Sequence, residues 1–195
     1  MALQAENDRW RLRILPDDEP FSPRDADPFS TWVCWHSRYT LGDSHTYARP
    51  QDFLAAITPR VALIFPLYLY DHSGLTVSLA SFAGRAPHAS WDSQQVGFAY
   101  VLKSTVRQEY KISRITPRIY EKVRRCVEAE VQEYNQYLHG DIYGFLVEAK
   151  TVCDHDTVHY DTVDSAWGFY GDDWAANGLA AYLSEEVRPL LQALA

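Results

Sequence analysis

The amino-acid sequence predicts an α+β fold, in which an antiparallel sheet of about five to six strands, built as a hairpin and meander, packs against one long amphipathic helix and a C-terminal helix. A hydrophobic run at residues 61–70 followed by a turn signal predicts the hairpin, and apolar residues at helical spacing over 117–138 predict the long helix. Hydrophobic residues make up 47% of the chain and charged residues 23%, as in ordinary globular proteins. For 195 residues we expect an irregular N-terminal arm over 1–30 and a single α+β domain over 31–195.

The N-terminal arm is rich in proline, aspartate and arginine, and four prolines interrupt any regular element there. These prolines are Pro16, Pro20, Pro23 and Pro28. Residues 31–35 (TWVCW) are β-prone and predict a short strand. A brief helix is expected from Arg49-Pro50 to Ile57, because Pro59 disfavours helical angles at the residue before it.

The strongest strand signal is at residues 61–70 (VALIFPLYLY), whose continuous hydrophobicity indicates burial on both faces, while Pro66 requires a bulge or an edge. Residues 71–74 (DHSG) have the composition of a tight turn, and residues 75–80 alternate apolar and polar side chains as a returning strand does. Residues 95–102 predict a further strand. Three neighbouring strands need no crossover, so we expect an antiparallel meander.

The long helix is expected to begin with Thr116 as its N-cap and Pro117 at the first helical position, where a missing N–H does no harm. Gly140 supplies a C-terminal stop, which gives a helix of about 22 residues. Its apolar positions recur at helical spacing. They are Ile119, Val123, Cys126, Val127, Val131, Tyr134 and Leu138.

Two more strands and a closing helix complete the expected elements. The strands are predicted at residues 142–148 and 165–170, and the helix at 177–194. Pro189 is expected to kink or break this helix, because it removes a backbone hydrogen bond.

The short apolar runs, the composition of the N-terminus and the cysteine spacing predict a protein that stays inside the cell. No uncharged apolar run approaches the ~20 residues that a membrane helix needs, and the N-terminus has no apolar segment of the secretory type. We therefore expect a cytoplasmic protein without membrane association. Cys34, Cys126 and Cys153 are widely spaced, which favours free thiols over a disulfide framework or a zinc site.

Charge is distributed unevenly along the chain. Residues 1–139 contain 16 basic and 16 acidic residues, whereas 140–195 contain 2 basic and 10 acidic ones, so the net charge of −8 lies in the last 56 residues. Residues 103–125 hold eight basic residues against two acidic ones. The sequence therefore predicts a basic stripe and an acidic C-terminal third.

Four residues are candidates for acid–base chemistry: Asp71, His72, Asp92 and His36. Asp71, His72 and Ser73 cannot form a catalytic triad among themselves, because adjacent residues in a turn point in different directions. His72 could act as a general base with a carboxylate supplied from elsewhere. The competing interpretation is that the turn residues hydrogen-bond their own backbone.

The densest group of metal-type ligands is formed by Asp154, His155, Asp156 and His159. Carboxylate oxygens together with imidazole suit a divalent ion. The spacing matches no established metal loop, however, and a polar hairpin needs no ion. We therefore expect no metal and no cofactor.

Three segments, at residues 91–97, 140–144 and 164–173, combine glycine and aspartate with tryptophan or tyrosine. Such segments build rigid corners, because glycine permits unusual backbone angles and aspartate caps turns. The same side chains can present a recognition surface, and the sequence leaves both interpretations open. The candidate binding residues are Trp91, Asp92, Asp141, Tyr143, Asp164, Trp167, Asp172 and Asp173.

Five motifs, in this order along the chain, resemble those of a family of uncharacterised small proteins from bacteriophages and integrative elements. The motifs are TWVCWHSRYTLGD, LYLYDHSG, WDSQQVGFAYV, EYNQYLHGDIYGF and DSAWGFYGDD. The resemblance covers residues 31–180 and implies a mobile-element setting and a single structural unit, but no catalytic residue. Where that family has glycine in the third motif and cysteine in the last, this chain has Gln94 and Ala166.

These features rank the functions. The leading hypothesis is a non-enzymatic binding protein of a phage or mobile element, whose acidic surface occupies a host protein such as a nucleic-acid-handling defence enzyme, as anti-restriction or anti-CRISPR inhibitors do. The same acids could instead form only a solvated face. The alternative is a small metal-assisted or acid–base hydrolase or nuclease using His72 and nearby carboxylates. Direct nucleic-acid binding through residues 103–125 is disfavoured by the overall negative charge.

Overall fold

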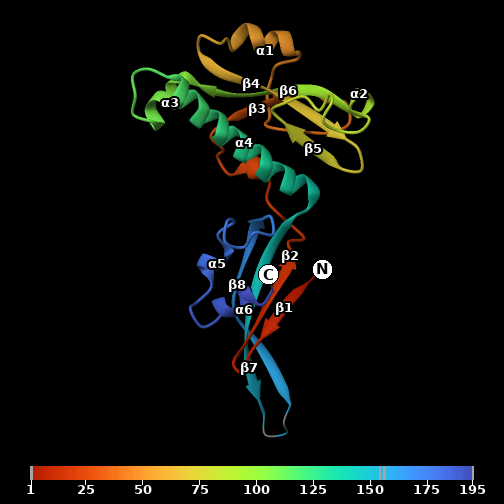
Figure 1. The fold of residues 1–195 in the computed structure, drawn as a ribbon, viewed down its shortest axis with the longest axis vertical. Helices are drawn as coiled ribbons and strands as arrows, with labels where there is room; N and C mark the ends of the chain where they lie inside the picture. The colour runs from red at the N-terminus through yellow and green to blue at the C-terminus, as the bar shows by residue number, and fades with distance from the viewer. Residues whose placement is uncertain (1, 154, 156, 195) are drawn as a thin grey trace. The chain divides into compact units, whose positions relative to one another are not determined.

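The structure, a computed structural model, describes residues 2–153, 155 and 157–194. It is an α+β protein with two four-stranded antiparallel sheets (Figure 1). The chain divides into two compact units, which we call unit 1 (Met1–Phe21 and His139–Ala195) and unit 2 (Ser22–Leu138). The prediction of one sheet was wrong, because the strands of each unit cover a hydrophobic core of their own.

The sheet of unit 2 contains β3 (Thr31–Cys34), β4 (Ala62–Asp71), β5 (Leu75–Ser78) and β6 (Ser93–Leu102) in the order β3-β6-β4-β5. The predicted hairpin of β4 and β5 is confirmed. The predicted meander is wrong, because β6 pairs with the other edge of β4 and not with β5. Pro66 lies on this central strand, and the register shifts one residue later, between Leu67 and Tyr68.

Helices cover both faces of this sheet. The predicted long helix is confirmed as α4 (Pro117–His139), and Figure 1 shows it on the opposite side of the sheet from α1 (Pro50–Ala56). Val123, Val127 and Val131 of α4 are buried in the core of unit 2. Residues four positions apart lie on one face of a helix, so all three are on the same face of α4. Phe53 of α1 stacks on Phe98 of β6. Short helices α2 (Ala89–Asp92) and α3 (Lys103–Glu109) flank β6.

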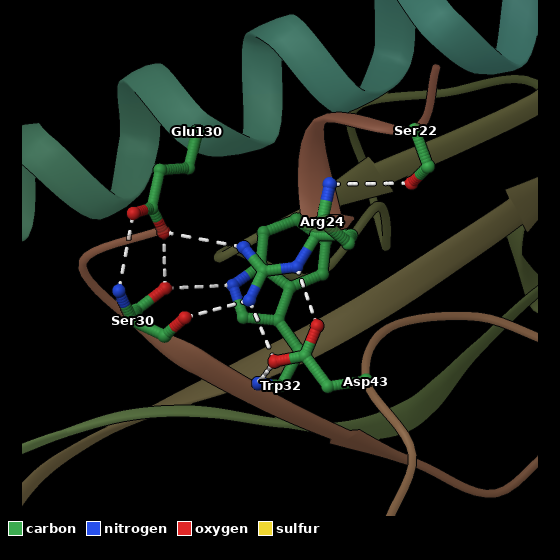
Figure 2. Close-up of polar contacts among 6 residues, drawn as sticks. All are labelled: Ser22, Arg24, Ser30, Trp32, Asp43 and Glu130. Carbon is green, nitrogen blue, oxygen red and sulfur yellow. Dashed lines mark hydrogen bonds and ion pairs between the residues drawn. The ribbon is translucent and has the colours of Figure 1, made fainter. Parts of the chain in front are cut away.

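A buried arginine holds the first segment of unit 2 in place. Arg24 lies in the 3₁₀ turn η1 (Pro23–Asp25), and its side chain is 4% exposed. Its Nε and Nη2 donate to the two carboxylate oxygens of Asp43 at 2.8 and 2.7 Å (Figure 2). Nη1 lies 3.5 Å from Glu130 of α4, and the guanidinium carbon lies 4.4 Å from the centroid of the Trp32 ring. Arg24 therefore joins the turn, β3 and α4.

The two carboxylates around Arg24 also bind β3 and the segment before it. Glu130 accepts hydrogen bonds from the backbone N–H of Ser30, at 3.1 Å, and from its hydroxyl. Asp43 accepts from the backbone N–H of Trp32 at 2.8 Å, and the Trp32 indole donates to Ser30 Oγ at 2.8 Å. Every charged group in this cluster thus has partners, which a buried charge requires.

The sheet of unit 1 has the order β1-β2-β7-β8 and consists of β1 (Leu3–Glu6), β2 (Trp10–Pro16), β7 (Ile142–Val152) and β8 (Val158–Tyr170). Residues 1–30 were expected to be irregular, but β1 and β2 lie within them. In β2 the buried Leu12 and Ile14 alternate with arginines, which is the period-two pattern of a half-buried strand.

The predicted C-terminal helix is interrupted in the structure. It forms two short helices, α5 (Leu179–Tyr182) and α6 (Arg188–Gln192), with Pro189 in the first turn of α6. The segment between them still contributes Leu183 and Val187 to the core. Burial of Leu183 and Val187 therefore holds this segment in the core, although the helix is interrupted there. None of the helices in the described part of the chain combines the length and apolarity that crossing a bilayer requires.

Removing Arg24 should destabilise the protein strongly. Arg24→Ala removes the buried counter-charge of the partly buried Asp43 and Glu130, so we expect a loss of about 3–5 kcal/mol in the free energy of unfolding. The milder Glu130→Gln should cost about 1–3 kcal/mol. Urea unfolding measures both.

Arg49→Ala provides the control, because Arg49 is 73% exposed in its pair with Asp52 and should change stability by less than about 1 kcal/mol. A loss for Arg24→Ala as small as that of the control would contradict the structural role of the buried cluster.

Candidate functional site: an acidic aromatic groove

A groove of about 580 Å³ in unit 1 joins two segments that are distant in sequence. One segment follows β2 and the other is the end of β8. The lining residues, which we call the acidic aromatic groove, are Asp17, Asp18, Glu19, Phe21, Trp167, Gly168 and Tyr170. The groove therefore combines three carboxylates with three aromatic rings.

Trp167 is positioned by a glycine on the neighbouring strand. The register of β7 and β8 shifts between Tyr143 and Phe145, which leaves Gly144 beside the Trp167 ring. A Cβ atom at Gly144 would lie 2.1 Å from Cε3 of Trp167, so only glycine lets the ring approach the backbone this closely. The Trp167 side chain remains 47% exposed, which leaves part of the ring available to a ligand.

Backbone hydrogen bonds hold the acidic segment against the sheet. The N–H of Asp17 donates to the carbonyl of Ile142 at 2.8 Å. At the other end of the segment, the Tyr170 hydroxyl donates to the carbonyl of Phe21 at 2.6 Å. The Phe21 side chain itself is 83% exposed. The groove is thus fixed at both ends while its aromatic ring at residue 21 faces solvent.

Unit 1 carries the negative charge of the molecule. Its residues include 15 acidic and 5 basic side chains, a net charge of −10, whereas unit 2 has 11 acidic and 13 basic ones, a net charge of +2. The N-terminal Asp17, Asp18 and Glu19 belong to the same unit as the acidic C-terminal third. The two units therefore differ more in net charge than residues 1–139 and 140–195 do.

The basic residues of unit 1 already have partners. Arg11 and Arg13 pair with Glu148, and Lys150 pairs with Glu6. Of the two remaining basic residues, Arg9 pairs with Glu186, and Arg188 donates to backbone carbonyls. Within the residues that the structure describes, ten carboxylates of unit 1 have no ion pair. They are Asp8, Asp17, Asp18, Glu19, Asp141, Asp161, Asp164, Asp172, Asp173 and Glu185.

The candidate binding residues from the sequence fall in several places. Trp167 lies in the groove, whereas Asp172 and Asp173 line a separate hollow of about 690 Å³ beside Trp174. Tyr143 packs edge-on against Trp174; burial raises its pKa, and the carboxylates of Asp141 and Asp172 raise it further. Asp141 and Asp164 are exposed in the same unit.

Trp91 and Asp92 belong to unit 2 and do not join this surface. Of the seven groove residues, only Trp167 was among the candidates from the sequence. The six others are Asp17, Asp18, Glu19, Phe21, Gly168 and Tyr170. The available signal was the acidic run at 17–19 ahead of an aromatic residue, which belonged to a segment that was expected to be an irregular arm.

Three of the four acid–base candidates converge in unit 2. His36, Asp71 and Asp92 line a pocket of about 190 Å³ together with Arg38 and Trp91. Other residues around it are Leu69, Ser93 and Gln94. Trp91 is 88% exposed. The pocket is small and its polar groups are engaged with each other: Arg38 Nη2 lies 2.6 Å from Asp71, and His36 Nδ1 accepts backbone N–H groups of residues 38 and 39.

His72 is not among the residues that line this pocket, but its Nδ1 lies 2.8 Å from Oδ2 of Asp92, which does line it. The His72 ring stacks with the rings of Tyr70 and His88, with a centroid separation of 5.7 Å in each pair. The hydroxyls nearby are occupied, because Ser73 donates to the carbonyl of His72 and Ser93 to that of Ala89. The His72–Asp92 pair thus has the geometry of a general base, while these two described hydroxyls are already hydrogen-bonded to backbone carbonyls.

The predicted metal candidates cannot be compared as a set, because Asp154 and Asp156 lie outside the described residues. His155 and His159 are described and exposed. Among residues 2–153, 155 and 157–194, no group of three or more histidine, cysteine, aspartate or glutamate side chains has the arrangement that a metal ion needs.

The cysteines differ in acidity. Hydrogen bonds from the backbone N–H of His155, the His159 side chain and Thr157 lower the pKa of the Cys153 thiol to about 7. Burial raises the pKa of Cys34 to about 12, and the Asp43 carboxylate acts in the same direction. At neutral pH, Cys153 is therefore the thiol with the greater share of nucleophilic thiolate.

Comparisons with known proteins give no relative for this chain. No protein-family model, no curated protein and no solved structure matches it.

The acidity of Cys153 can be measured by alkylation in a Cys126→Ser background. Because only the thiolate reacts, the rate at Cys153 should rise through a midpoint near pH 7, while Cys34 stays unreactive until far higher pH. His159→Ala should move the midpoint upward, since it removes a hydrogen bond to the thiolate.

His155→Ala is the matched control and should leave the midpoint unchanged, because His155 acts through its backbone N–H. A midpoint near ~8.5, the ordinary value for cysteine, would show that these hydrogen bonds do not stabilise the thiolate.

Proposed function

We propose that this protein is a non-enzymatic, cytoplasmic binding protein that presents the acidic surface of unit 1 to a basic region of a host protein. The observation that carries the proposal is the set of ten carboxylates that have no ion pair among the described residues of unit 1, three of which line a groove with exposed aromatic rings. A surface of one charge sign attracts partners of the opposite sign and accelerates their encounter. Aromatic side chains at its centre supply the apolar contact area that binding hot spots need.

A nucleic-acid-handling enzyme is the partner class that this surface suits best. Such enzymes carry basic grooves for phosphate backbones, and a rigid acidic surface can occupy the same groove. The five motifs resembling a phage and mobile-element family support a counter-defence setting, in which an inhibitor of anti-restriction or anti-CRISPR type blocks a host nuclease. The negative surface repels nucleic acid itself, so we place binding on the protein partner.

Binding to purified restriction endonucleases and CRISPR-associated nucleases tests the proposal directly. We expect at least one enzyme to bind at ~50 mM salt, to lose affinity steeply as salt rises, and to be blocked from its DNA. Asp17→Asn with Asp18→Asn and Glu19→Gln should weaken this binding about tenfold or more at low salt, because three charges at the groove are removed. Isothermal calorimetry and a cleavage assay give both quantities.

A matched triple variant in unit 2 controls for the change in total charge. Asp25→Asn, Asp27→Asn and Glu109→Gln alter three exposed acids outside unit 1 and should leave the affinity unchanged. Absence of binding to every enzyme, binding that ignores salt, or equal losses for the two triple variants would each overturn the proposal.

The alternative function is an acid–base hydrolase or nuclease built on His72. The specific observation in its favour is that His72 bonds Asp92, which lines one pocket with His36 and Asp71. A water molecule activated by His72 would then have to act as nucleophile. His72→Ala should abolish any hydrolysis of model phosphodiester or ester substrates while circular dichroism stays unchanged. Equal turnover in the variant and the parent protein would exclude this role for His72.

A further inference from the structure

Four arginines of this chain are each held by a carboxylate and an aromatic ring together. Arg11 Nε donates to Glu148 at 2.5 Å, and its guanidinium carbon lies 3.5 Å from the centroid of the Tyr160 ring. The Tyr160 hydroxyl in turn donates to Glu6 at 3.0 Å. The hydrogen bond from Arg11 lowers the pKa of Glu148 and keeps this half of the pair ionised.

Three other arginines repeat the arrangement. Arg24 lies between Asp43 and the Trp32 ring, and Arg38 pairs with Asp71 while lying 5.2 Å from the Tyr39 centroid. The fourth is Arg9, which pairs with Glu186 beside the ring of Trp10. A carboxylate that binds the guanidinium and an aromatic ring within about 6 Å of it therefore recur together at these four arginines.

The acidic aromatic groove contains the same two kinds of group, carboxylates and aromatic rings. Its carboxylates come from Asp17, Asp18 and Glu19, and its rings from Phe21, Trp167 and Tyr170, while none of its seven described lining residues is basic. We propose that this groove is the docking site for an arginine side chain of the partner. The inference rests on the proposed function and specifies the chemical group that the groove recognises.

Arginine fits the groove better than lysine for a geometric reason. A planar guanidinium stacks on an indole or phenyl face and still donates in its own plane to carboxylates, whereas an ammonium group is a strongly hydrated point charge. The Trp167 ring is suited to such stacking because one part of it lies on Gly144 and 47% of the side chain stays exposed.

A second copy of this chain is a poor occupant. Bringing two units of net charge −10 together places unpaired carboxylates against each other, which costs free energy at ordinary ionic strength. The charge of the groove therefore selects a basic segment of another protein over self-association.

The probe for this site is the capped peptide acetyl-Gly-Arg-Gly-amide, titrated into the full chain and followed by the indole N–H resonance of Trp167, which a Trp167→Phe variant assigns. We expect saturable binding in the millimolar range. The lysine peptide should bind at least about threefold more weakly, and the citrulline peptide, a neutral isostere, should not saturate.

Two variants locate the binding. The triple variant at residues 17, 18 and 19 should lose saturable binding of the arginine peptide, and the matched triple at residues 25, 27 and 109 should keep it. No saturable shift up to ~20 mM peptide, equal shifts for all three peptides, or full binding by the groove triple would each overturn the inference.

The outcomes separate this inference from the proposed function. If a nuclease binds with steep salt dependence but the arginine peptide does not bind, the acidic surface acts without an arginine-specific groove. If the peptide binds but no nuclease does, the groove recognises arginine and the proposed partner class fails.

Discussion

The interaction on which this structure depends is the arginine held between a carboxylate and an aromatic ring. In unit 2, Arg24 joins a turn, a strand and the long helix α4 through Asp43, Glu130 and the face of Trp32. In unit 1, Arg11 joins β2 to the hairpin of β7 and β8 through Glu148 and Tyr160. The Arg24 guanidinium is buried and that of Arg11 is partly buried, so the loss of a partner is costly at both and each cluster fixes the position of several segments at once.

The same interactions determine the electrostatics of the surface. Because every basic residue of unit 1 is engaged in an ion pair or with backbone carbonyls, the remaining carboxylates have no internal counter-charge among the described residues. The net charge of unit 1 follows from its composition, and the pairing of its basic residues decides which described carboxylates lack an ion pair.

The acidic aromatic groove also illustrates preorganisation. Gly144 lets Trp167 lie on the strand backbone, and the hydrogen bonds of Asp17 and Tyr170 fix the segment that carries the carboxylates. A site whose parts are already in place loses less conformational entropy on binding. The pocket around His36 and Asp71 differs, because its charged groups mainly satisfy one another.

Local patterns in the sequence determined the long helix, the β4–β5 hairpin and the acidic C-terminal third, because capping, periodicity and charge act between near neighbours. Only the tertiary structure decided that β6 pairs with β4, that residues 10–16 form a strand beside β7, and that the segment from Asp17 to Phe21 lines a groove with Trp167. These pairings join segments more than a hundred residues apart or choose between two available edges. Long-range burial makes that choice, and no local propensity encodes it.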